Sequence, residues 1–89
     1  MTITPNEDVM FRRLGERMIL IHLQSNEIFD LNETSARMWE LLVETGEPDA
    51  VEARLAGEFD VDPADLHREV ASTLATLAQN GLITGYDPR

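Results

Sequence analysis

The spacing of apolar residues changes once along this chain, close to Leu31. Up to that residue the sequence consists of short segments rich in β-branched, aromatic and other apolar residues, separated by turn-forming residues. After it, apolar residues recur every three or four positions. A period of two is typical of strands, and a period of about 3.6 is typical of helices. The change predicts an α+β protein in which a sheet is followed by helices.

The residues before the change form three candidate strands, which lie at Asp8–Arg13, Arg17–Leu23 and Glu27–Leu31. Gly15 interrupts the first joint and Asn26 the second, and both joints are short enough for antiparallel hairpins. Apolar residues occupy both faces of the middle segment, which suits a central strand. The first and third strands then become edges, each with unpaired backbone N–H and C=O groups.

Three helices are expected after the change, from Asn32 to Gly46, from Pro48 to about Asp60 and from Pro63 to Asn80. Asn32 and Asp62 are typical N-cap residues, and proline at positions 48 and 63 fits the first position of a helix. Our first choices for core residues are Leu31, Trp39, Leu55, Phe59 and Leu66. Residues 1–89 are therefore expected to form a single domain, a three-stranded antiparallel sheet followed by three helices in a winged helix-turn-helix-like arrangement.

The charge balance bears on the partners of such a domain, because many winged-helix domains bind DNA. The chain has 17 acidic and seven basic residues, a formal net charge of −10, and every base is arginine. In the third helix Arg68 stands against Asp65 and Glu69. DNA and RNA binding draws most of its affinity from cations that replace counterions on phosphates. A DNA-binding regulator is therefore the disfavoured alternative, and we expect no nucleic-acid partner.

The location of the protein follows from what the sequence lacks. There is no apolar stretch of about eighteen residues and no basic start followed by an apolar centre. We expect a cytoplasmic protein with no membrane partner. With no cysteine in the chain, neither disulfides nor thiolate metal ligands are available.

Catalytic chemistry has few candidate residues in this sequence. The two histidines, His22 and His67, have no partner at a recognisable motif spacing, and none of the common metal, nucleotide or nucleophile motifs is present. We expect no enzyme activity, no catalytic residues, no metal and no cofactor. A remaining role is binding, since the third strand as an edge could accept an extended peptide as one more strand.

A family resemblance supports this role. The segment Asn26–Leu42 resembles the central signature of the PqqD family, in which an aromatic-rich third strand ends in an acid-Leu-Asn turn and enters a helix bearing a tryptophan. Two later segments, Phe59–Asp62 and Leu74–Ile83, resemble the remaining blocks of the family. The match runs from about Val9 to Ile83. Members serve as recognition elements for ribosomally synthesised, post-translationally modified peptides.

The resemblance implies that this chain is a RiPP recognition element, which binds the leader region of a precursor peptide without catalysis. The leader would pair as an added β-strand with the third strand, and its side chains would rest in a groove against the third helix. Carried over by position, the pairing edge comprises Glu27, Ile28, Phe29, Asp30 and Leu31. The groove candidates are Val70, Ala71, Thr73, Leu74 and Leu77, some of which must instead belong to the core.

The resemblance leaves two settings for the partner enzymes. As a free-standing domain the chain is similar to leader-binding proteins of lasso-peptide biosynthesis, where a separate leader peptidase and a cyclase process the precursor. It is also similar to PqqD itself, which delivers a precursor to a radical SAM enzyme in pyrroloquinoline quinone biosynthesis. We favour the lasso setting, although no residue of this chain identifies the enzyme.

Overall fold

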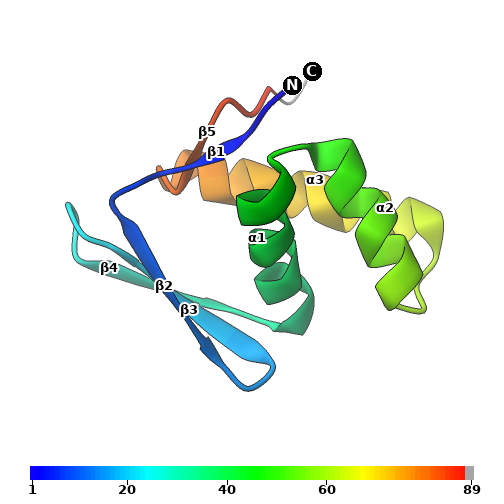
Figure 1. Cartoon of the computed structure of the whole chain (residues 1–89), viewed down its shortest axis with the longest axis horizontal. Helices are drawn as coiled ribbons and strands as arrows, with labels where there is room; N and C mark the ends of the chain where they lie inside the picture. Colours follow the sequence, from blue (N-terminus) through cyan, green and yellow to red (C-terminus); the bar gives the residue numbers. More distant parts are fainter. Residues whose placement is uncertain (88–89) are drawn as a thin grey trace.

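The computed structural model, which describes residues 1–87, contains the three long strands and three helices in the predicted order (Figure 1). The strands are β2 (Val9–Leu14), β3 (Arg17–His22) and β4 (Glu27–Leu31). The helices are α1 (Glu33–Thr45), α2 (Pro48–Glu58) and α3 (Pro63–Gln79). Two further strands, β1 (Thr4–Pro5) and β5 (Ile83–Thr84), lie near the chain ends. The predicted α+β arrangement is confirmed, with one additional strand pair.

The larger sheet has the order β2-β3-β4, and both pairings are antiparallel. Phe11, Leu20 and Phe29 form one cross-strand row. Side chains alternate along β3, so that Met18 is buried towards the helices while Ile19 is half-buried on the opposite face. This confirms that β3 is the central strand and that β2 and β4 are edges.

Local capping signals set the helix boundaries. The side chain of Asn32 accepts a hydrogen bond of 2.9 Å from the Ser35 N–H at the start of α1. Asp62 accepts hydrogen bonds from two backbone N–H groups in the first turn of α3. Gly46 ends α1 with a φ of 68°, a left-handed conformation that glycine adopts at little cost. The predicted helix starts are thus confirmed.

The core lies between the sheet and the helices. Trp39, the largest fully buried side chain, has 0% of its surface exposed, and Leu55 and Leu66 are also buried. Leu31 and Phe59 are only partly buried and pack against the core from outside, which corrects their expected place among the core residues. The partial burial of both residues follows from their positions, because Leu31 ends an edge strand and Phe59 is the C-cap residue of α2.

The two ends of the chain pair in a small antiparallel ladder, β1 with β5, in which Thr4 lies opposite Thr84. Ile3 precedes this ladder and is 1% exposed, and its N–H donates a hydrogen bond of 2.7 Å to the carbonyl of Gly46. The sequence pattern did not predict β1, since two residues that include Pro5 are too few to show a period. The ladder closes the core beside α1 and α3.

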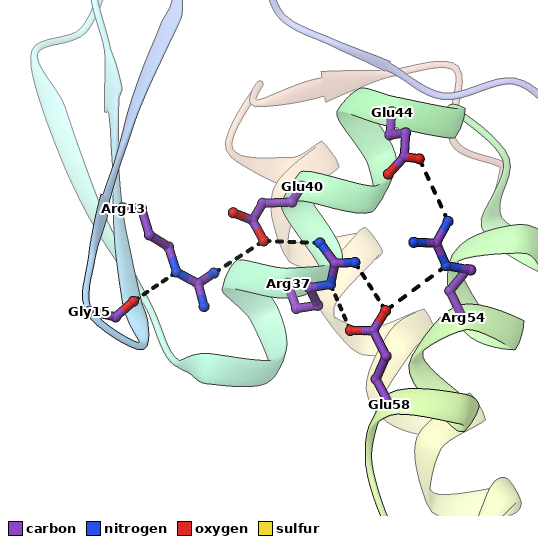
Figure 2. Close-up of polar contacts among 7 residues, drawn as sticks. All are labelled: Arg13, Gly15, Arg37, Glu40, Glu44, Arg54 and Glu58. Atoms are coloured by element: carbon purple, nitrogen blue, oxygen red, sulfur yellow. Dashed lines mark hydrogen bonds and ion pairs between the residues drawn. The ribbon is translucent and has the colours of Figure 1, made fainter.

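A chain of ion pairs links the β2–β3 hairpin to α1 and α2 on the surface (Figure 2). Glu40 lies 3.4 Å from Arg13 and 3.3 Å from Arg37. Arg37 then forms two hydrogen bonds with Glu58, of 2.7 and 3.0 Å. These bonds hold the pKa of Glu58 below and that of Arg37 above their ordinary values. The network connects the hairpin and the two helices across the surface.

Within residues 1–87, no helix is long and apolar enough to cross a membrane.

Candidate functional site

β4 is an edge strand whose outer side is unpaired in the part of the chain that the structure describes, because the sheet order places only β3 beside it. The small sheet formed by β1 and β5 is separate from this edge. Unpaired N–H and C=O groups along an edge are a template for one more strand. The geometry of β4 decides which of its residues offer them.

The backbone groups of Ile28 and Asp30 point away from the sheet. The N–H of Leu23 donates a hydrogen bond of 2.9 Å to the carbonyl of Asp8, so the backbone groups of Leu23 point towards the β2 side of the sheet. Backbone groups of successive strand residues point to opposite sides, so the preceding residue, His22, points to β4. By the same alternation Leu20 and Met18 also point to β4, and the three partners there are Glu27, Phe29 and Leu31. Two residues of β4 therefore remain free to pair outward.

The side chains of β4 alternate between the two faces of the sheet. Phe29 and Leu31 are half-buried and pack against the core on the helix side. Ile28 is 67% exposed on the outer face, where Asp30 also lies and forms an ion pair of 3.1 Å with Arg17. A strand paired with this edge would place alternate side chains on these two faces.

The third-helix candidates do not all lie on one surface. Val70, Leu74 and Leu77 are buried, with 3%, 2% and 3% of their surfaces exposed. Ala71 and Thr73 are half-buried. The buried three belong to the core, as the sequence analysis expected of some of the set.

Ala71 and Thr73 lie on opposite sides of α3, since two residues along a helix are separated by about 200°. The carbonyl of Ala71 accepts a hydrogen bond of 3.5 Å from the Tyr86 hydroxyl, so Ala71 faces the chain ends. Figure 1 shows the chain ends above the helices, whereas the sheet lies below and to the left of α3. Thr73 is therefore the candidate that faces away from the chain ends, and Ala71 is not.

The C-terminal end of α3 adjoins the Glu27 end of β4. A Cβ on Gly81, just after the helix, would lie 3.5 Å from Nε2 of His22. His22 is the register partner of Glu27. This juxtaposition of a free edge and a helix end is the candidate site.

In residues 1–87 no three histidine, aspartate or glutamate side chains gather closely enough to hold a metal ion. His22 is 8% exposed, and its Nδ1 has no hydrogen-bond partner among these residues. His67 is exposed and pairs with Glu52 at 2.8 Å.

Residues 17–83 match the family model described as coenzyme PQQ synthesis protein D (PqqD), which covers more than half of the chain and includes β3, β4 and all three helices. The chain belongs to the PqqD family. No curated protein sequence matches this PqqD-family chain.

Two solved structures share the fold of this PqqD-family member. The first is TbiB1 in complex with the TbiA(beta) leader peptide, with a TM-score of 0.88 and 27% identity, over 94% of this chain and 98% of that one. The second is a lasso peptide synthetase B1 complexed with the leader peptide, with a TM-score of 0.84 and 24% identity, over 96% and 100% of the two chains. The resemblance to a recognition-element fold is confirmed.

Proposed function

We propose that this protein binds the leader segment of a ribosomally synthesised precursor peptide and presents it to separate processing enzymes, without catalysing a reaction itself. The observation that carries this proposal is the free edge of β4, in a fold shared with two proteins solved as leader-peptide complexes. The whole chain would act as one binding domain in the cytoplasm, where precursor peptides are made, and it would need no cofactor.

The leader pairs with β4 through the outward N–H and C=O groups of Ile28 and Asp30. Its side chains on the helix side meet Phe29, Leu31 and the side of α3 that carries Thr73, and Leu77 supports that side from within the core. Backbone pairing gives affinity for an extended segment of many sequences, and the side-chain contacts give selectivity. Val70 and Leu74 act from the core, and Ala71 lies outside this site.

The processing enzymes are a leader peptidase and a cyclase of lasso-peptide biosynthesis. The name of one similar structure, a lasso peptide synthetase B1, supports this setting. The second candidate is delivery to a radical SAM enzyme, and the description of the matching family, coenzyme PQQ synthesis protein D, favours it. In both settings the outer edge of β4, at Ile28 and Asp30, binds the leader; we call it the leader edge.

The experiment is amide hydrogen exchange, followed by NMR, with and without a synthetic leader peptide. Pairing on the edge should slow exchange at the amides of Ile28 and Asp30, whereas Phe29, already paired with β3, should change little. The opposite edge supplies the control, because Arg13 on β2 should exchange equally with and without the leader. Slower exchange at Arg13 and not at Ile28 would place the peptide on β2 and contradict the proposal.

A further inference from the structure

Two adjoining cavities lie between α2 and α3, outside the leader edge. The larger, of about 340 Å³, is lined by Met1, Pro48, Asp49, Glu52, His67, Val70, Ala71, Leu74 and Tyr86. The smaller, of about 220 Å³, is lined by Asp49, Glu52, Ala53, Ala56, Pro63 and Leu66. They share Asp49 and Glu52, so these two acids stand where the cavities meet. We call the pair the α2–α3 cavities.

The lining combines an apolar floor with negative charge at its centre. Val70, Leu74 and Leu66 at the floor are buried core residues. Among the described residues, the other charged or titratable groups of the lining are the side chains of His67 and Tyr86 and the amino group of Met1, and no described arginine lines either cavity. Glu52 pairs with His67 at 2.8 Å, while Asp49 is exposed. Two carboxylates against the one ammonium of Met1 leave a net negative charge on the described surface between the two apolar hollows.

This surface stays open when a peptide lies on β4. Ala71 lines the larger cavity, and Thr73 lies on the opposite side of α3. A helix with its side chains is about 10 Å across, so a strand paired with Ile28 and Asp30 does not reach the α2–α3 cavities.

We propose that the α2–α3 cavities bind a segment of a partner protein in which one arginine or lysine stands between apolar residues. The apolar side chains fill the two hollows, and the cation lies between Asp49 and Glu52. A neutral apolar segment would cover Asp49 and leave its charge unpaired, and an acidic segment would be repelled by both carboxylates. The net charge of −10 favours the same basic partner at longer range.

The identity of the partner rests on the proposed function, because a processing enzyme is the protein that must dock while the leader occupies β4. The apolar and basic residues that the bound segment must carry do not depend on the proposed function. Separate sites for the leader and the enzyme would let both bind at once, which raises the effective concentration of the leader at the enzyme.

The test is titration of the ¹⁵N-labelled full chain with acetyl-Leu-Arg-Leu-amide and acetyl-Leu-Gln-Leu-amide, followed by amide chemical shifts. The arginine peptide should move the amides of Asp49, Glu52 and Ala71, with a Kd of about 1 mM or weaker for so small a ligand. The glutamine peptide should bind about fivefold more weakly, since a partly exposed ion pair is worth about 1 kcal/mol. Equal binding of the two peptides, or shifts confined to other residues, would overturn the proposal.

Two double variants separate this site from general attraction to an acidic protein. Asp49→Asn with Glu52→Gln should abolish the preference for arginine. Glu7→Gln with Glu16→Gln removes the same amount of charge elsewhere and should retain it. Loss of the preference in both doubles would show non-specific attraction and reject the site. Leader binding is read separately at the amides of Ile28 and Asp30, so failure of either proposal leaves the other measurable.

Discussion

Gly85 is a position at which the pairing of the two chain ends leaves no room for a side chain. Its φ is 87°, and a Cβ at this position would lie 2.3 Å from the carbonyl oxygen of Thr2. Both partners are backbone, so neither can move aside without separating β1 from β5. Gly57, in α2, has no atom within 4 Å of the corresponding position. An added methyl group therefore clashes at Gly85 and fits at Gly57.

We expect Gly85→Ala to lower the free energy of unfolding by about 2 kcal/mol, from left-handed strain together with the contact with Thr2. Gly57→Ala should raise it by about 0.5 to 1 kcal/mol, because alanine is the better helix former. Urea denaturation of both variants measures the difference. Equal midpoints for Gly85→Ala and the parent protein would show that the end ladder contributes little to stability.

Glu58 is the residue whose titration couples most clearly to folding. Hydrogen bonds from Arg37 lower its pKa in the folded state, so its contribution to stability is complete above the unfolded pKa of about 4.3. The contribution is lost as the pH falls through the lowered folded pKa. The difference in Tm between the parent and Glu58→Gln should therefore be largest near neutral pH, shrink below about pH 4 and diminish with added salt. Glu16→Gln, a change at an exposed turn acid, is the control, and a Tm difference for Glu58→Gln that is constant with pH would contradict the assignment.

Among the elements, β4 carries the strongest functional prediction. Alternation along a strand divides its residues into two sets, Glu27 with Phe29 and Ile28 with Asp30, and the sequence alone does not decide which set points outward. The register of β3 and β4 decides between them, since Ile28 and Asp30 point outward. Proline lacks an N–H, so it removes a hydrogen bond to the leader in one set and to β3 in the other.

Ile28→Pro should weaken leader binding at least fivefold, by the loss of about 1 kcal/mol for one hydrogen bond, with a small change in Tm. Phe29→Pro should lower Tm by several degrees, because it breaks the β3–β4 ladder and removes a side chain that packs on the core. Arg13→Pro, on the other edge, should leave affinity unchanged. Fluorescence polarisation with a labelled leader and thermal melting provide the two readouts, and normal affinity in a folded Ile28→Pro variant would exclude pairing at that position.

The elements also show where sequence patterns reach their limit. Helix starts were predictable because capping residues such as Asn32 and Asp62 act on neighbours within one turn. The orientation of α3 was not, since Ala71 and Thr73 flank the same apolar stripe and only the packing of Tyr86 distinguishes their sides. The substitution Leu74→Arg, which the sequence would suggest as a test of the groove, would instead place a charge in the core, where Leu74 is 2% exposed.

At the scale of the whole molecule, a winged helix-turn-helix-like fold and a net charge of −10 point to different partners. Many winged-helix domains bind DNA, whereas the acidic charge of this chain opposes contact with phosphate. We expect no association with duplex DNA at micromolar protein in moderate salt, measured by fluorescence polarisation of a labelled duplex. Micromolar affinity that falls steeply with rising salt would restore the DNA-binding alternative.

The pairing of β1 with β5 brings the N–H of Asp87 within 3.5 Å of the Met1 sulfur. Met1 and Asp87, the first and last residues that the structure describes, therefore lie at one corner of the molecule, remote from β4 in Figure 1. This makes the protein a transplantable module: it could be spliced into a loop of another polypeptide, or its ends joined and new ones opened in the β2–β3 turn. Either rearrangement would leave β4 unchanged. A polypeptide joined at this corner would lie beside the larger cavity, because Met1 and Tyr86 form part of its wall.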